Sequence, residues 1–383
     1  MKRIMLEEQF RELFISTENQ YINLFGQKYI GKYYFLENLN KEGLFPEEKT
    51  LWIQKIKNQS WDDLIIENNE VEILIFQSEE IIDFFEFQSF IESKMINGKI
   101  IFTTDLPIIE IGVSNFEISG VYFREFCKYS GLEITVKELM IGNIDIKKGN
   151  ILLGQYIQRG YFPSHLDKPD RIFSDFEEKC TIMKQELYKK EYNEFMEFLR
   201  TLAMNTGNLF KADQLAKMLG ISRRKIHKYM EILLKYNSIA AIGPWSENSL
   251  TETTRHVKVY FTDLSFLHAL LGDLHFQGAM KEGAIQNFVY LELREKLGKT
   301  HDLFFYRKKS GAEIAFLLIH KESGMITPIE VHVRETDVIS QILRSFDESY
   351  HDRVDYYMIS NESRYGKKQL NEKPLIIIPH LAI

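Results

Sequence analysis

The chain of 383 residues lacks several features that would place it at once in a class of protein. Its two cysteines, Cys127 and Cys180, lie far apart and outside any C-x-x-C pattern, so neither a disulfide framework nor a structural zinc site is indicated. No uncharged apolar run reaches the roughly 18 residues that a membrane-spanning helix needs. The N-terminal sequence MKRIMLEEQF carries acidic residues where a secretory leader has an apolar stretch. We therefore expect a cytoplasmic protein with no membrane partner.

The net charge of −7 hides an uneven distribution of charge along the chain. Residues 61–90 contain nine Asp or Glu and no Lys or Arg, whereas residues 208–236 contain seven Lys or Arg and two acids. A nucleic acid, or any other phosphate-rich partner, would therefore contact the second segment. With 44% hydrophobic residues, the chain can form two or three domains that each have a core.

Apolar runs alternate with helical patterns in the N-terminal part of the chain. QYINLF (20–25), EVEILIFQ (70–77) and GKIIFTTD (98–105) have the length of buried parallel strands. A helical pattern separates the last two. This alternation predicts an α/β domain over residues 1–165.

After residue 165 the predicted secondary structure changes twice. Residues 166–257 are mainly helical in period, and strand patterns return in residues 258–383. The strands are accompanied by one helix near 278–297 and another near 338–347. The sequence therefore predicts a helical middle module followed by a second α/β domain.

The segment FGQKYIGKYY places Gly26, Gly31 and Lys32 in the spacing G-x-x-x-x-G-K. In a phosphate-binding loop, backbone N–H groups and a helix N-terminus surround the phosphates, the lysine neutralises them, and a following Ser or Thr ligates Mg²⁺. Here the following residue is Tyr33, whose hydroxyl lies at the far end of a rigid ring. These four positions are the candidate nucleotide-binding residues, and we expect no metal ligand among them.

A P-loop ATPase also needs acids at the end of a later apolar strand, where one holds Mg²⁺ and another orients the attacking water. The strand ILIFQS ends instead in Gln77 and Ser78, neither of which is charged. Glu79 and Glu80 follow, but a shift of two residues moves them off the strand end. For these two, a solvated start of an acidic helix is the favoured interpretation.

Residues 208–242 have the pattern of a helix-turn-helix. Apolar residues recur at helical spacing, Gly220 lies in the turn, and Ser222 can cap the second helix. The second helix carries four basic residues that are candidates for contacting DNA: Arg223, Arg224, Lys225 and Lys228. The alternative is a connector whose basic face is solvated or pairs with the acidic residues 61–90.

Several segments, taken in order, resemble bacterial and archaeal AAA-type ATPases whose C-terminal half is a domain of unknown function with a restriction-endonuclease-like fold. The resemblance rests on the glycine loop, IIFTTD, GVYFREF and QRGYFP. In that family the last three are a Thr-Gly-Ser sensor strand, a Leu-Ser-Phe-x-Glu-Phe segment and Gly-Gly-Tyr-Pro. Thr104 and Asp105 stand where the family has Gly-Ser, and Val113 stands in the place of an arginine. The resemblance implies that the middle module is winged-helix-like.

The resemblance also implies a nuclease-like metal site in the last domain. The family has Glu-Asn-Phe-Val on a helix, Glu-Val-Asp-Phe on one strand and Glu-Val-Lys on the next, whereas this chain has QNFV, EIAF and EVHV. Gln286, Ala315 and His332 thus replace the helix acid, the aspartate and the lysine, and only Glu330 remains. One carboxylate and one imidazole can hold a transition metal but form a poor Mg²⁺ site, because hard cations require several oxygen ligands. We expect no metal and no nuclease activity.

The sequence therefore predicts an α/β protein of three parts: an AAA/P-loop NTPase-like domain (1–165), a helical and winged-helix-like module (166–257) and a restriction-endonuclease-like domain (258–383). We expect no catalytic residue, and a non-catalytic relative of these ATPases that acts as a binding or scaffold protein. DNA, a protein partner and a second copy of the chain are the candidate partners. No cofactor is expected to be required, and ATP or ADP would bind weakly. The alternative is a weak ATPase that uses the remaining loop glycines and Lys32.

Overall fold

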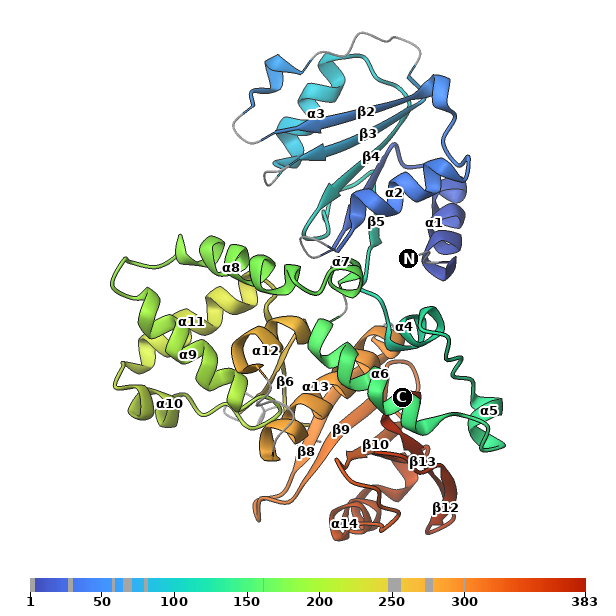
Figure 1. The fold of residues 1–383 in the computed structure, drawn as a ribbon, viewed down its shortest axis with the longest axis vertical. Helices are drawn as coiled ribbons and strands as arrows, with labels where there is room; N and C mark the ends of the chain where they lie inside the picture. Colours follow the sequence, from blue (N-terminus) through green and yellow to red (C-terminus); the bar gives the residue numbers. More distant parts are fainter. Residues whose placement is uncertain are drawn as a thin grey trace. The chain divides into compact units, whose positions relative to one another are not determined.

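The computed structural model describes residues 4–26, 30–56, 59–64, 71–78, 82–160, 162–246, 256–272, 278–298 and 300–383. Contacts divide the chain into two compact units, each with α-helices and β-strands (Figure 1). The first unit comprises residues 1–121 and 162–164, and the second comprises residues 122–161 and 165–383. The predicted α/β class is confirmed. Within the described residues, no helix is long and apolar enough to cross a membrane.

The first unit is built on a parallel sheet with the strand order β2-β3-β4-β1-β5. Its strands are β1 (Tyr21–Phe25), β2 (Thr50–Lys55), β3 (Ile73–Ser78), β4 (Lys99–Thr104) and β5 (Val113–Glu117). Its helices are α1 (Ile4–Ser16), α2 (Lys32–Lys41) and α3 (Phe84–Ser93). The three apolar runs predicted as strands overlap β1, β3 and β4. Strands β2 and β5 were not predicted.

Aromatic side chains fill both faces of this sheet. Tyr21 of β1 packs edge-on against Phe84 of α3. On the opposite face, Phe116 of β5 contacts Phe10 of α1 and Phe35 of α2. Because alternate residues of a strand face opposite sides, α3 covers one face while α1 and α2 cover the other.

The position of β1 between β4 and β5 determines which loops meet at the carboxyl edge of the sheet. After β1 the chain continues to β2 at one edge of the sheet. After β4 it continues to β5 at the opposite edge. The loops that follow β1 and β4 therefore lie next to each other at the carboxyl edge. In open α/β sheets, ligands bind at such a reversal of strand order.

The second unit begins with helices that the sequence had assigned to the first domain. Its helices are α4 (Phe123–Tyr129), α5 (Val136–Met140), α6 (Ile146–Arg159), α8 (Arg171–Lys184), α9 (Tyr192–Met204), α10 (Ala212–Leu219), α11 (Arg223–Lys235), α12 (Leu264–Leu271), α13 (Gly278–Leu297) and α14 (Gln341–Tyr350). A short helix, α7 (Pro163–Asp167), spans a boundary between the units. The unit boundary lies before α4, not at residue 165, because Phe123 packs against Phe288 of α13 and Gly149 of α6 lies against Leu381.

Helices α9, α10 and α11 form a group that is followed by a two-stranded antiparallel hairpin (Figure 1). The hairpin consists of β6 (Ile239–Ile242) and β7 (Lys258–Phe261). The predicted boundary at 257/258 separates these two strands. The amide of Asn287 on α13 also bonds to both the N–H and the C=O of Phe261, at 2.7 and 2.8 Å. The hairpin is thereby fixed to the helix that begins the C-terminal region.

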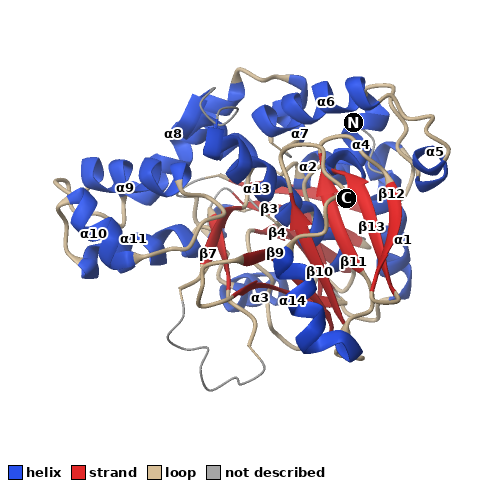
Figure 2. Ribbon diagram, turned by 90° about the horizontal axis from the view of Figure 1, so that it is seen from below, coloured by secondary structure: helices blue, strands red, loops and turns tan. Residues whose placement is uncertain are grey.

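A six-stranded mixed sheet completes the second unit, in the order β12-β13-β11-β10-β9-β8. Its strands are β8 (His301–Arg307), β9 (Glu313–His320), β10 (Ile326–Val331), β11 (Tyr357–Asn361), β12 (Gly366–Leu370) and β13 (Lys373–Pro379). Figure 2 shows β10, β11 and β13 side by side, and these three are parallel. Leu343 and Phe346 of α14 pack with Leu317 and Tyr357 in the core on one face of this sheet.

Candidate functional site

Two glycines bring the chain from β1 into α2. The Gly26 N–H donates to the Thr104 carbonyl at 3.2 Å, and a Cβ on Gly26 would lie 2.4 Å from the Ile118 carbonyl oxygen, so a side chain does not fit. Gly31 has a φ of 88°, a left-handed conformation that glycine adopts readily. Residues 27–29 between them lie outside the described residues. The backbone conformations of Gly26 and Gly31 thus let the chain leave β1 and begin α2.

Lys32 is the first residue of α2, and its side chain returns to the loop. Its Nζ donates to the Gly26 carbonyl at 2.6 Å and to Asp105 Oδ1 at 2.9 Å. The side chain is only 13% exposed. The structure therefore brings together Gly26, Gly31 and Lys32, and it adds Asp105, a residue distant in sequence that follows β4.

Tyr33 does not contribute to this cluster. Its ring packs edge-to-face against Trp52 of β2, with 5.4 Å between the ring centroids. A Ser or Thr ligates Mg²⁺ from an oxygen one bond beyond Cβ, so the tyrosine hydroxyl is too far from the backbone to replace it. Position 33 serves to attach α2 to β2.

The end of β3 is also unlike a metal site. Gln77 and Ser78 are its last residues, and Ser78 lies alongside Lys55 of β2 in the parallel register. Lys55 is 7% exposed. A cation at this strand end opposes the binding of a second cation. Glu79 and Glu80, which the sequence predicted as a solvated helix start, lie outside the described residues.

A buried asparagine in β1 holds the chain on both sides of Asp105. Asn23 Oδ1 accepts from Thr104 Oγ1 at 2.8 Å, and Asn23 Nδ2 donates to the Leu106 carbonyl at 3.3 Å and to Asn115 Oδ1 at 2.9 Å. A buried amide needs such partners, so these contacts fix the loop to the sheet. Sequence reasoning missed Asn23, although a polar residue inside the apolar run QYINLF is a signal for a role of this kind.

The predicted helix-turn-helix corresponds to α10, a short turn and α11. The Ser222 hydroxyl accepts from the Lys225 N–H at 3.3 Å, and so caps α11 as expected. Leu215 of α10 packs inward with Ile226 and Leu233 of α11, since all three are buried. These residues belong to the predicted apolar spacing.

The four basic residues predicted to contact DNA fall into two groups. Arg223 and Arg224 lie exposed in the first turn of α11, and Arg223 has Asp213 Oδ1 at 3.4 Å. The lysines instead form ion pairs with glutamates that precede or begin α9: Lys225 with Glu194 (2.6 Å), Lys228 with Glu191 (2.7 Å) and Lys235 with Glu186 (2.7 Å). We call these three contacts the α11–α9 ion pairs. Lys225 and Lys228 thus face the protein's own carboxylates.

Two of the α11–α9 ion pairs also lower the pKa of their glutamates. The hydrogen bond from Lys228 holds the pKa of Glu191 below its ordinary value, and that from Lys235 does the same for Glu186. Burial raises the pKa of Tyr229, whose hydroxyl donates to Glu194 at 3.4 Å. Glu186 and Glu191 thus remain ionised to a lower pH than an ordinary glutamate and stay available as carboxylates for the lysines.

Glu330, the one acid that remains of the nuclease-like pattern, has a structural contact. It is 5% exposed, and its Oε1 accepts from the Ser340 hydroxyl. The Ser340 oxygen in turn accepts from the Leu343 N–H at 3.2 Å and caps α14. The other carboxylate oxygen lies 3.2 Å from His332 Nε2. The carboxylate therefore connects β10 to the start of α14.

The remaining nuclease-like positions supply no acid. The register of β8 against β9 shifts at Ala315, so that Ala315 and Phe316 together face Phe305 in a β-bulge. Gln286 lies on α13, and its buried Oε1 has no hydrogen-bond partner among the described residues. In the part of the chain that the structure describes, no group of three or more His, Cys, Asp or Glu is placed to hold a metal.

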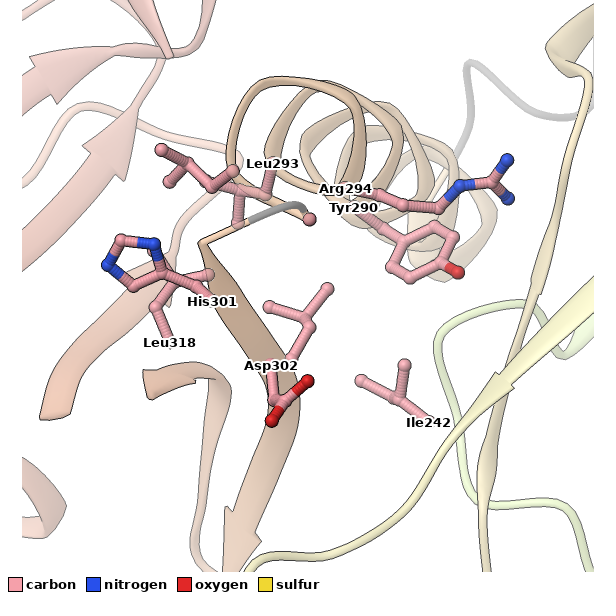
Figure 3. A pocket seen from close by; sticks show the side chains of 10 residues that line it. Ile242, Tyr290, Leu293, Arg294, His301, Asp302 and Leu318 are labelled. Atoms are coloured by element: carbon pink, nitrogen blue, oxygen red, sulfur yellow. The ribbon is translucent and has the colours of Figure 1, made fainter. Parts of the chain in front are cut away.

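A cavity of about 220 Å³ lies in the second unit, and none of the predicted site residues lines it. It is lined by aliphatic side chains, among them Ile242, Leu293 and Leu318, and by the polar side chains of Tyr290, Arg294, His301 and Asp302. Figure 3 shows the imidazole of His301 and the guanidinium of Arg294 on opposite sides of this hollow, directed away from each other. Ligand pockets usually measure roughly 300–1,000 Å³ and have convergent polar groups. This cavity is therefore smaller than a usual ligand pocket, and its Arg294 and His301 side chains do not converge.

Two family models match the chain, each over less than half of its length. One, a domain of unknown function (DUF8612), matches residues 151–275, and the other, a domain of unknown function (DUF4143), matches residues 281–378. Two uncharacterised proteins, from Mycobacterium bovis and Mycobacterium tuberculosis, are each 28% identical to this chain over 147 residues. This match covers 38% of the chain and 33% of each relative, so it spans about a third of the relatives' length.

Two solved structures have distant similarity to the chain. The ORC1 protein of Aeropyrum pernix in complex with DNA has a TM-score of 0.27 and 9% identity, over 71% of this chain and 92% of that one. Can2 of Sulfobacillus thermosulfidooxidans in complex with cyclic tetra-adenylate has a TM-score of 0.16 and 11% identity, over 77% of this chain and 84% of that one. Both TM-scores are too low to indicate a shared fold.

Proposed function

We propose that this chain is a non-catalytic relative of the AAA-type ATPases and acts as a binding or scaffold protein. The observation that carries the proposal is the packing of Tyr33 against Trp52. Because of this packing, the residue at the position of the P-loop hydroxyl connects α2 to β2 and supplies no metal ligand. Uncharged side chains, Gln77 and Ser78, end the strand that would hold Mg²⁺ from the other side.

Loss of the metal ligands removes hydrolysis, whereas it only weakens binding. Mg²⁺ neutralises the charge on the phosphates during transfer, and a positioned acid orients the attacking water. The loop glycines and Lys32 remain, and they support weak binding of ATP or ADP that depends little on Mg²⁺. In this proposal the protein needs no cofactor to fold or to bind its partner.

The test is phosphate release from ATP with and without Mg²⁺, on the parent chain and on Lys32→Ala. We expect no release above the blank from either protein. The matched variant Tyr33→Thr restores the hydroxyl but not the acids at the end of β3, and it should also be inactive. Mg²⁺-dependent release by the parent that disappears in Lys32→Ala would overturn the proposal in favour of a weak ATPase.

A second candidate function is binding of duplex DNA by a winged-helix-like module formed by α9–α11 and the β6–β7 hairpin. The observation that favours it is the exposure of Arg223 and Arg224 in the first turn of α11, the part of a recognition helix that usually contacts DNA. Among the described residues, Arg224 has no carboxylate within ion-pair distance. Phosphates of a duplex would provide the anion that Arg224 lacks.

The test uses two double variants that remove the same charge from one helix. Arg223→Gln with Arg224→Gln removes the exposed pair, and Lys225→Gln with Lys228→Gln removes two of the α11–α9 ion pairs. Fluorescence anisotropy with a labelled duplex at rising salt should show binding lost in the arginine variant and retained in the lysine variant. Equal losses would mean that net charge alone attracts DNA. Salt-independent binding, or none in the parent, would leave the scaffold function alone.

A further inference from the structure

The Lys32 ammonium group of the glycine loop is already paired with a carboxylate of the same chain. Lys32 Nζ lies 2.9 Å from Asp105 Oδ1, so the pair is within hydrogen-bond distance. The Gly26 carbonyl accepts a second hydrogen bond from the same amine at 2.6 Å. In a phosphate-binding loop the lysine acts as a point charge for phosphate oxygens. Asp105 therefore stands where a phosphate group would meet this charge.

The backbone places this carboxylate, since the residues on both sides of it are held. The carbonyl of Thr104 accepts from the Gly26 N–H at 3.2 Å. The carbonyl of Leu106 accepts from Thr104 Oγ1 at 2.6 Å and from the buried Asn23 at 3.3 Å. The glycine loop and the loop after β4 are thus bonded directly to each other. The loop after β4 carries two acids, Asp105 and Glu110, and Asp105 is the one that bonds to Lys32.

The difference in exposure between the two partners determines how the contact can open. The Lys32 side chain is 13% exposed, whereas that of Asp105 is 58% exposed. The carboxylate can therefore rotate into water while the lysine remains at the loop. If it stays near the loop it repels an incoming phosphate, and if it leaves, its bond to Lys32 is lost. In both cases Asp105 opposes the binding of a phosphate group.

We infer that Asp105 is an internal competitor for Lys32, and that it lowers the affinity of the glycine loop for nucleoside di- and triphosphates. The inference rests on the proposed function, in which the loop retains a binding role without hydrolysis. It assigns part of the weakness of binding to a specific carboxylate, in addition to the missing metal ligands. Binding should accordingly strengthen when this one charge is removed.

The test is isothermal titration of the whole chain with ADP in the absence of Mg²⁺. Asp105→Asn keeps the size of the side chain and removes its charge, so ADP should bind about tenfold more tightly than to the parent. Glu110→Gln is the matched control, because it removes one negative charge from an exposed position of the same loop that has no contact with Lys32. This control should bind ADP as the parent does. Adding Lys32→Ala to Asp105→Asn should abolish the gain.

Each result of the titration decides the inference. Equal affinity of Asp105→Asn and the parent, including no detectable binding by either, would overturn it. An equal gain in ADP affinity in Glu110→Gln would also overturn it, because the net charge of the protein would then explain the repulsion of ADP. Hydrolysis is measured separately in the same samples. Mg²⁺-dependent phosphate release by the parent would reject the non-catalytic function, whatever the affinities, whereas a failed gain without hydrolysis would reject only the role of Asp105.

Discussion

Lys258 Nζ lies 2.6 Å from Glu313 Oε1, although the lysine side chain is completely buried. Arg307 lies 2.6 Å from the other oxygen of the same carboxylate. Burial lowers the pKa of Lys258, while Glu313 favours its charged form. Lys258 belongs to β7 and Glu313 to β9, so this ion pair joins the hairpin to the six-stranded sheet.

Removal of the carboxylate should therefore be more harmful than removal of the lysine. Glu313→Gln leaves a buried ammonium group without its anion, which costs about 3 kcal/mol of unfolding free energy. Lys258→Met fills similar space without a charge and should cost less than about 1 kcal/mol. Urea unfolding at neutral pH measures both. Equal, small losses would show that water reaches this pair.

His380 should make the protein sensitive to mild acid. Burial lowers the pKa of His380 to about 4, and its Nδ1 lies 2.7 Å from the Ser360 hydroxyl. The unfolded chain binds a proton at this histidine near pH 6.5 and the folded chain does not, so stability is lost as the pH falls from about 6.5 to 4. The full effect is about 3 kcal/mol.

The check is a comparison of unfolding free energies for the parent and His380→Asn between pH 7 and pH 4. Asparagine retains a group that can bond to Ser360, but it does not titrate. The difference between the two proteins should therefore shift in favour of the variant as the pH falls. A constant difference over this range would mean that the imidazole is protonated within the fold.

The α11–α9 ion pairs should contribute to stability, whereas the exposed arginines should not. Lys228→Met leaves Glu191, a nearly buried carboxylate, without its cation, and should cost about 1 kcal/mol. Arg224→Met at an exposed position should change stability by less than about 0.5 kcal/mol. Thermal unfolding of the two variants distinguishes these outcomes. A larger loss in Arg224→Met would show that this side chain has a structural partner.

Glu330 should matter for folding and not for cleavage of nucleic acid. Plasmid DNA and RNA should remain intact after incubation with the parent chain and Mg²⁺ or Mn²⁺, because one carboxylate and one imidazole do not hold a hard cation. Glu330→Ala should destabilise the protein by about 1–2 kcal/mol, since the Ser340 cap of α14 loses its partner. Cleavage by the parent that is absent in Glu330→Ala would contradict this assignment.

Local patterns in the sequence were sufficient to predict many of the elements. Apolar runs predicted β1, β3 and β4, and the helix near 278–297 corresponds to α13. Ser222 was placed correctly as a helix cap, because a cap depends only on residues within the same turn. The glycine spacing likewise located the loop between β1 and α2.

Contacts between distant residues could not be predicted in the same way. The lysines of α11 were predicted to contact DNA, with a solvated face or pairing with the acidic residues 61–90 as the alternative. Their partners are instead glutamates 31 and 37 residues earlier in the chain. Asp105 meets Lys32 only because β4 lies beside β1 in the sheet. The bulge at Ala315 depends on pairing with β8, and a single strand carries no sign of it. Strand order and charge pairing are set by tertiary packing.

The pairing of β6 with β7 has a practical consequence for dissecting this chain. A fragment that ends at residue 257 would keep β6 and lose its partner strand. The exposed N–H and C=O groups of β6 would then offer an edge for aggregation. Asn287 and Lys258 connect the same hairpin to elements further along the chain. Fragments intended for DNA-binding measurements should therefore extend through the C-terminal sheet. The helix-turn-helix alone would lack the later elements with which it folds cooperatively.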